Sequence, residues 1–182
     1  MPVRAFVAVL VLALLGLGGW GAYAWFTQSP DNQFESLRAG DCIRLLDVPG
    51  VGPAPDGTLT VRHEEADCAE GPTPMTYTVG VVGPGQTPCP NGDYVEYYQV
   101  STSRTAGQNT REHTACLVPN FEPDLCYGED DSTLGYQVVP CGQGALLHVD
   151  SVTSDPSQTC RNGARKLSFP HPPRLFCVRP PA

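Results

Sequence analysis

The sequence predicts an α+β protein: an N-terminal transmembrane helix followed by a disulfide-rich, mainly antiparallel β ectodomain of two related β-β-β-α-β units. Three observations lead to this fold class. A long uncharged run lies near the N-terminus, the chain of 182 residues contains 8 cysteines, and a block with its flanking cysteines occurs twice. Gly and Pro number 19 each, which favours short strands and many turns over long helices.

The uncharged run covers residues 5–26, AFVAVLVLALLGLGGWGAYAWF, and is long enough for a helix across a bilayer. Arg4 precedes it, and acidic residues come before the next basic residue, Arg38. The positive-inside rule therefore places residues 1–4 in the cytoplasm and everything after the helix outside, beginning with a polar tether at 27–40. We expect a single-pass protein of the cell membrane with an extracytoplasmic C-terminal domain. The alternative is a signal peptide cleaved after Ala24, which makes the protein secreted.

Export places the cysteines in an oxidising compartment, where an even number indicates disulfides. In an antiparallel hairpin, the start of the first strand lies beside the end of the second. Cys42 opens one apolar run and Cys68 closes the following apolar run, so a hairpin of these two runs brings the two cysteines within reach of a disulfide. The same argument pairs Cys126 with Cys141. The predicted pairs are Cys42–Cys68, Cys89–Cys116, Cys126–Cys141 and Cys160–Cys177. The alternative pairs first with fourth and second with third cysteine in each copy.

The repeated block is TVGVVGPGQTPCPNG at residues 78–92, which returns in altered form as LHVDSVTSDPSQTCRNG at 147–163. Each copy has two cysteines before the block and one after it, and the last lies in Cys-x-x-Pro both times. We therefore interpret residues 41–119 and 120–182 as two four-cysteine units. Each unit alone is marginally stable, so we expect them to pack into one compact body.

Apolar runs and the alternation of apolar with polar residues predict the strands of both units. In the first unit they lie at 42–46, 59–63, 75–81 and 113–118. A short helix is expected before the last of these, because Tyr94, Tyr97 and Tyr98 fall at i, i+3 and i+4. In the second unit the strands are expected at 125–128, 135–139, 145–152 and 175–178, with a short helical or irregular piece at 162–167.

The sequence shows no pattern that indicates catalysis, a metal or a cofactor. It has no Gly-x-Ser-x-Gly or Ser-x-x-Lys motif, and HEEAD at 63–67 has Asp67 where a zinc protease motif needs its second histidine. The cysteines are too far apart for a zinc site, and a disulfide leaves no thiolate. The acidic cluster at 129–131 is interpreted as an exposed turn. We therefore predict no catalytic residue, no metal ligand and no cofactor.

Tyr94, Tyr97 and Tyr98 are the candidate binding surface, as an aromatic platform for a sugar or a peptide. Packing of a helix on the sheet explains the same spacing. The net charge of −8 argues against nucleic acid as a partner, because its phosphates require a basic surface.

Gly40-Asp41-Cys42, Cys68, the strand from Tyr77 to Val79, Cys89 and Cys116-Leu117 together resemble the LppU-type family of actinobacterial cell-envelope proteins. The Gly-Asp-Cys opening is also similar to the septum-formation domain of the same bacteria. The resemblance covers about residues 36–119 and implies an exported protein without an assigned activity. This chain departs from it in two ways. It has no lipidation cysteine before Cys42, and it carries a second four-cysteine unit.

We expect a membrane-anchored, extracytoplasmic binding or interaction module of the bacterial cell envelope, without catalytic activity and stabilised by four disulfides. The expected partners are the cytoplasmic membrane and another envelope protein or a wall component. The alternative is a membrane-tethered envelope enzyme such as a cell-wall hydrolase.

Overall fold

The computed structural model describes residues 33–54, 58–102, 109–142, 144–161 and 163–181. The chain divides into two compact units, 1–36 and 37–182. The described part of the first is a four-residue helix, α2 (Gln33–Ser36). The predicted cytoplasmic end at 1–4, the predicted transmembrane run at 5–26 and the start of the tether lie outside the described residues. Among those that are described, no helix combines the length and the apolar character needed to cross a membrane.

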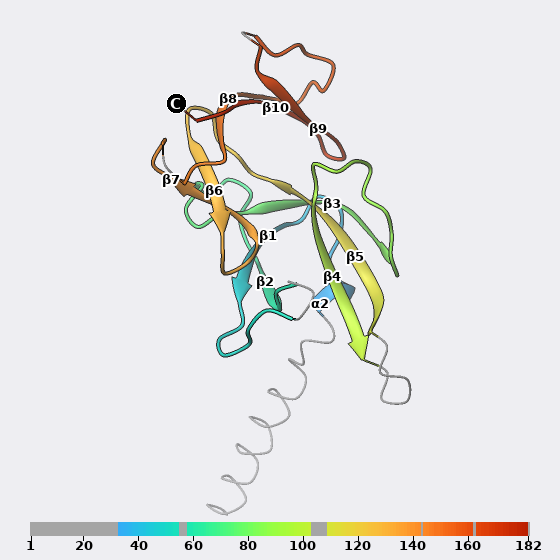
Figure 1. The fold of residues 1–182 in the computed structure, drawn as a ribbon. Coiled ribbons are helices and arrows are strands. Elements are labelled where there is room, and N and C mark those ends of the chain that lie inside the picture. The colour runs from blue at the N-terminus through green and yellow to red at the C-terminus, as the bar shows by residue number, and fades with distance from the viewer. Residues whose placement is uncertain (1–32, 55–57, 103–108, 143, 162, 182) are drawn as a thin grey trace, which may run out of the picture. The chain divides into compact units, whose positions relative to one another are not determined.

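The second unit contains two five-stranded antiparallel sheets (Figure 1). The strands of the first sheet are β1 (Cys42–Asp47), β2 (Val61–Glu65), β3 (Tyr77–Pro84), β4 (Val95–Thr102) and β5 (Asn109–Pro119), in the spatial order β2-β1-β3-β5-β4. The strands of the second are β6 (Cys126–Asp130), β7 (Gly135–Val139), β8 (Leu147–Thr153), β9 (Arg165–Pro170) and β10 (Pro173–Arg179), in the order β7-β6-β8-β10-β9.

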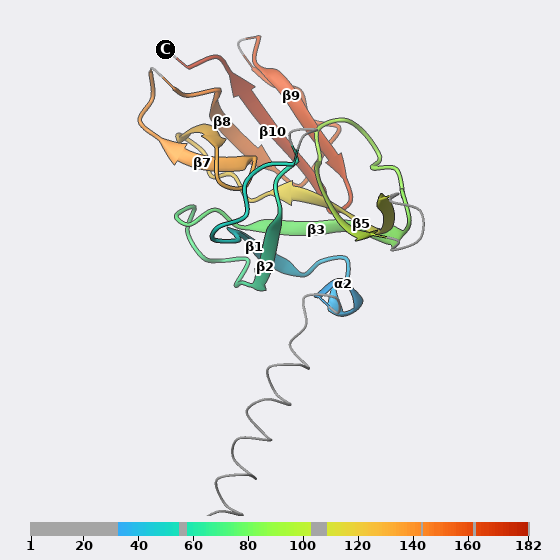
Figure 2. The same ribbon diagram turned by 60° about the horizontal axis from the view of Figure 1, so that its bottom comes forward.

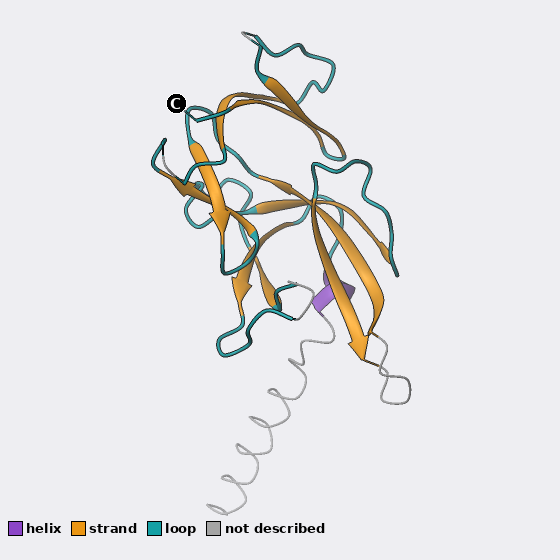
Figure 3. Cartoon of the chain, in the orientation of Figure 1, coloured by secondary structure: helices purple, strands orange, loops and turns teal. Residues whose placement is uncertain are grey.

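The predicted α+β class is wrong, because the described chain is almost entirely strand and loop (Figure 3). The tyrosines expected on a helix lie at the entrance of β4 and within it, and the expected helical piece at 162–167 leads into β9. Residues 95–102, VEYYQVST, are rich in the β-branched and aromatic residues that strands favour. Eight of them pair with β5, and this ladder outweighs the helical spacing of three tyrosines. Each four-cysteine unit is therefore β-β-β-β-β, not β-β-β-α-β.

The two sheets are copies of one arrangement, since β1 to β5 and β6 to β10 follow the same spatial order. The disulfides repeat with them. Cys42–Cys68 and Cys126–Cys141 each join the start of the first strand to the segment after the second. Cys89–Cys116 and Cys160–Cys177 each join the loop after the third strand to the fifth strand. The predicted pairing is confirmed, and the nested alternative is wrong.

The central strands are buried along their middle on both faces. Residues 115–118 of β5 have no exposed surface, and residues 175–178 of β10 are exposed by at most 5%. The second sheet is covered by an aromatic cluster in which Phe121 contacts Tyr127, Tyr136 and Phe176 with ring centroids 4.4 to 5.2 Å apart. Phe121 belongs to the short connection between the sheets, so this connection contributes to the core.

The second sheet lies against one side of the first (Figure 2), and polar contacts join them at several places. At one end, the Tyr94 hydroxyl donates a hydrogen bond to the carbonyl oxygen of His171 at 2.9 Å. Gly80 leaves room for this turn, because a Cβ there would lie 2.2 Å from the same oxygen. Near the connection, Arg174 donates to the side-chain oxygen of Asn120 at 2.6 Å. The two four-cysteine repeats thus pack into one compact unit, 37–182, as the sequence predicts.

Candidate functional site

The three tyrosines of the predicted binding surface occupy three different environments. Tyr94 and Tyr97 are each only 7% exposed. Tyr94 packs edge-on against Phe169 and holds the turn at His171. Tyr97 packs edge-on against His63, with its hydroxyl 3.1 Å from the Nδ1 of that histidine.

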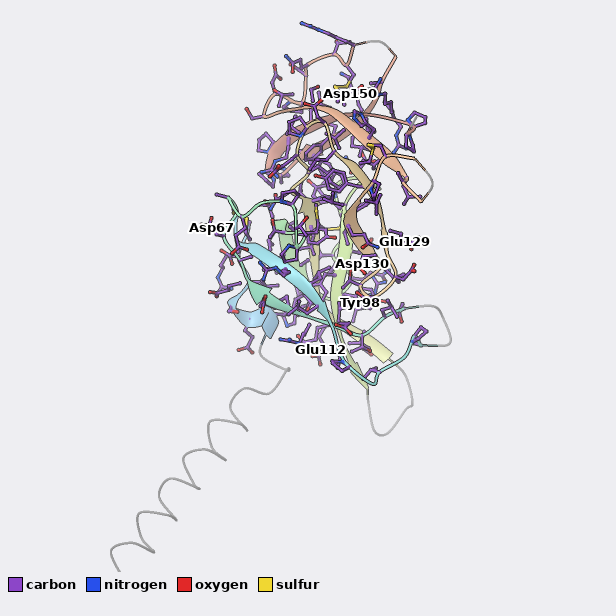
Figure 4. The ribbon with its side chains drawn as sticks, turned by 90° about the vertical axis from the view of Figure 1, so that its left-hand side faces the viewer. Asp67, Tyr98, Glu112, Glu129, Asp130 and Asp150 are labelled. Atoms are coloured by element: carbon purple, nitrogen blue, oxygen red, sulfur yellow. A yellow bond between two sulfur atoms is a disulfide. The ribbon has the colours of Figure 1, made fainter. Side chains whose placement is uncertain are left out.

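Tyr98 (Figure 4) is half-buried on the opposite face of β4. Arg111 stacks on its ring, 3.8 Å from the centroid. Consecutive side chains of a strand point to opposite faces, so Tyr97 and Tyr98 cannot form one surface. The structure therefore does not bring the three tyrosines together as a platform.

A groove of about 310 Å³ lies where the two repeats meet. We call it the inter-repeat groove. The first repeat contributes residues 44–47 of β1, residues 72–75 and Tyr77. The second contributes Asp130, Ser132 and Thr133 of the β6–β7 hairpin and residues 136–138 of β7. It is the candidate functional site, because it exists only when both copies are present.

One tyrosine side chain fixes the position of β7 at the base of the inter-repeat groove. The Tyr77 hydroxyl oxygen accepts a hydrogen bond from the backbone N–H of Tyr136 at 2.8 Å. A Cβ on Gly135 would lie 2.3 Å from that hydroxyl oxygen, so the contact requires glycine. Burial raises the pKa of Tyr77 well above its usual value, so the side chain stays neutral and serves as a hydrogen-bonding group.

The acidic cluster at 129–131 lies where β6 ends and the turn of the β6–β7 hairpin begins, with Glu129 and Asp130 as the last residues of β6 (Figure 4). The Asp130 carboxylate accepts hydrogen bonds from the backbone N–H and hydroxyl of Ser132 and from the hydroxyl of Thr133. This Asx-type turn places the Asp130 side chain in the groove wall and leaves its negative charge without a basic partner among the described side chains.

The charged side chains that line the groove leave it negatively charged. Arg44 is its basic residue, and its guanidinium is already paired with Glu64 at 2.6 Å and with Glu70. The Nε of Arg44 is buried without a hydrogen-bond partner. Asp47, by contrast, is exposed at the end of β1 and lines the groove together with Asp130. The inter-repeat groove therefore presents two carboxylates that pair with no arginine in the described part of the chain.

Two strand edges border the groove. β3 pairs with β1 only at Cys42 and Ile43, so from Arg44 onward β1 has a neighbour on one side alone, β2. β7 is the outermost strand of the second sheet. Backbone N–H and C=O groups that face away from the sheet on such edges are available to a further strand.

Away from the groove, the described residues contain one cluster of potential metal-ligating groups and one buried histidine. Donor atoms of Cys126, Cys141 and His148 lie within 4.8 Å of one another, but both sulfurs belong to a disulfide and offer no thiolate to a metal. His63 of the HEEAD segment is buried in β2 and contacts Tyr97. Its burial lowers its pKa, while the charge of Glu65 opposes that shift.

No protein-family profile, no curated protein and no solved structure matches this chain. The candidate site therefore depends on the geometry of this chain alone. The sequence predicts the acidic turn at 129–131 but not the groove walls at 44–47 and 136–138. The signal that could have found β7 is its composition, GYQVV, which has no charge although the strand lies at an edge.

Proposed function

We propose that this protein is a non-catalytic, extracytoplasmic binding module of a bacterial cell envelope, held at the membrane by its apolar N-terminal segment, and that the inter-repeat groove is its binding site. Four disulfides fit an extracellular domain, because such bonds persist in oxidising compartments. The resemblance to LppU-type envelope proteins supports the same compartment.

The observation that carries the proposal is the placement of the groove. Its walls come from both copies of the repeat, and Tyr77 of one copy fixes β7 of the other at its base. A concave site between two packed units, with a few polar groups of defined position, is a common location for ligand binding. Tyr94 and Tyr97 are buried in structural contacts, so they are not part of this site.

The test is photo-crosslinking in living cells. A photoreactive amino acid at Gln137, exposed in the groove wall, is compared with the same amino acid at Gln158, an exposed glutamine outside the groove. We expect one envelope protein or wall fragment, identified by mass spectrometry, to be captured from position 137 only. Equal capture from both positions, or none from either, contradicts the proposed site.

A second measurement separates binding from catalysis. The detergent-purified full chain is incubated with isolated cell-wall sacculi, and the soluble fragments are quantified. We expect no release above that of the buffer control, whereas release by the purified chain identifies a wall hydrolase and overturns the non-catalytic proposal.

N-terminal sequencing of the protein in the membrane fraction shows whether cleavage after Ala24 occurs.

A further inference from the structure

We propose that the inter-repeat groove binds an extended, basic peptide segment of a partner protein, which adds to the second sheet as a strand beside β7. This inference rests on the proposed function and specifies the chemistry of the ligand. Three features of the described residues lead to it: an unprotected strand edge, the direction of its backbone groups, and the negative charge of the groove walls.

β7 differs in composition from the other outer strands. The two sheets end in β2, β4, β7 and β9. Charged residues protect three of these edges: β2 contains Arg62, Glu64 and Glu65, β4 contains Glu96, and β9 contains Arg165 and Lys166. β7, with the sequence GYQVV, has none. Natural edge strands usually carry charges that prevent pairing with other chains, so an uncharged edge beside a groove is suited to strand addition.

The ladder between β6 and β7 determines which backbone groups of β7 point outward. In an antiparallel pair, alternate residues direct their N–H and C=O toward the partner strand and away from it. Tyr136 directs its N–H away from β6, to the Tyr77 hydroxyl. Tyr127 directs its C=O away from β7, to the N–H of Leu146. Val138 lies opposite Tyr127, so its N–H and C=O point outward as well.

Tyr77 also limits the number of backbone hydrogen bonds that a ligand can make to β7. It occupies the outward N–H of Tyr136, which leaves the C=O of Tyr136 and both backbone groups of Val138 for an added strand. The added segment is therefore short, and its affinity depends on side-chain contacts as well as on the backbone. Val138 and Gln137 both line the inter-repeat groove, so the ligand lies within it.

The charge of the two groove walls selects a positively charged segment. Asp47 and Asp130 line the groove, while Arg44 is already paired with Glu64 and Glu70. A Lys or Arg in the bound strand approaches these carboxylates and leaves no buried charge unpaired. Acidic segments are repelled by the same two groups, which gives the groove its specificity.

The probe is a phage library of random peptides of about eight residues, the length of a typical short strand, selected on the full chain in detergent. We expect enriched peptides to alternate β-branched residues with others and to contain Lys or Arg. Synthetic copies are then measured by fluorescence anisotropy, together with copies that are N-methylated at the backbone positions facing β7. Methylation removes the donor and should abolish binding.

The key variant is Val138→Pro, which removes the outward N–H and leaves the ladder to β6 intact. Proline is tolerated at such edge positions. The repeat supplies a matched control, Glu65→Pro, on the outer strand of the first sheet. Glu65 lies opposite Ile43 next to the Ala66–Cys42 hydrogen bond, so its N–H also points outward, and it does not line the groove. We expect Val138→Pro to weaken the selected peptides by about tenfold, the loss of one backbone hydrogen bond, and Glu65→Pro to leave affinity unchanged.

The charge is tested with Asp47→Lys against Asp131→Lys, which makes the same charge change outside the groove lining. Weaker binding in the first variant alone supports the proposal. The strand-addition proposal is overturned if the selected peptides are acidic or bind both proline variants equally. It is also overturned if the chain forms a dimer that Val138→Pro dissociates. If crosslinking from position 137 still captures one partner in those cases, only the strand-addition inference fails. If it captures none, the proposed function fails with it.

Discussion

The hydroxyl oxygen of Tyr77 on β3 lies 2.8 Å from the backbone nitrogen of Tyr136 on β7 and accepts its hydrogen bond. The bond connects the two copies of the repeat and occupies a backbone donor that β6 cannot reach. Because Gly135 beside it has no side chain, the hydroxyl lies directly against the backbone of β7. Both tyrosines line the inter-repeat groove, so this contact forms part of its wall.

Tyr77→Phe is expected to lower the free energy of unfolding by about 1–3 kcal/mol, because the N–H of Tyr136 loses its partner in a buried position. Urea unfolding of the oxidised full chain, followed by tyrosine fluorescence, measures the change. Tyr98→Phe is the control, since Tyr98 lies half-buried on β4 and contacts Arg111 through its ring. An equal loss of stability in both variants contradicts the role assigned to Tyr77.

Gly80→Ala is expected to destabilise the contact between the sheets by about 1–3 kcal/mol, the usual cost of overpacking. The new methyl group would lie 2.2 Å from the carbonyl oxygen of His171, which is backbone and cannot rotate away. Thermal unfolding should show a lower midpoint. Gly71→Ala, where no atom lies within 4 Å of the added Cβ, should leave the midpoint unchanged.

Removal of either hairpin disulfide is expected to lower stability by about 2–4 kcal/mol. The two double variants are Cys42→Ala with Cys68→Ala and Cys126→Ala with Cys141→Ala, which open loops with sequence separations of 26 and 15. Denaturant unfolding compares both with the parent chain. Peptide mapping without reduction should recover the four neighbouring pairs from the parent, and recovery of nested pairs would show that the connectivity is wrong.

Stability is expected to fall on acidification because of His63. Burial lowers the pKa of this histidine from 6.5, with the charge of Glu65 opposing the shift. The folded state therefore binds the proton less readily than the unfolded state. The contribution of His63 is fully present above pH 6.5 and is lost as the pH falls through the lower, folded-state pKa.

Urea unfolding between pH 7.5 and pH 4.5 measures this dependence in the parent and in His63→Gln. We expect His63→Gln to lose part of the dependence of the unfolding free energy on pH, because the imidazole that titrates differently in the folded and unfolded states is gone. His171→Gln, at an exposed side chain, should retain that part of the slope. A slope that survives in His63→Gln would exclude His63 as its source.

The strands could largely be predicted from the sequence, since alternating residues and the eight cysteines are local signals. The predicted strand at 135–139 agrees with β7 at both ends. The helix predicted at 94–98 is wrong because three tyrosines at helical spacing also suit a strand, with Tyr97 buried and Tyr98 half-buried on the other face. The pairing of β4 with β5 decides between these alternatives, and the spacing of the tyrosines does not encode that pairing.

The groove could be predicted only in part. The acidic turn at 129–131 was recognised, but its position opposite Asp47 depends on how the copies pack, and no spacing in the chain encodes that packing. The early end of the β1–β3 ladder at Ile43 likewise leaves an open edge that alternation cannot reveal. Both features arise from contacts between residues far apart in sequence.

By itself the sequence determined the duplication, the four disulfides and most of the strands, because each of these follows from residue types at short, repeated spacings. The tertiary structure alone decided that all ten described strands form two like sheets and that Tyr77 meets β7 beside a shared acidic groove. The physical reason is that a strand pattern specifies which side of a segment is buried, whereas the neighbour that buries it is selected by close packing of the whole fold.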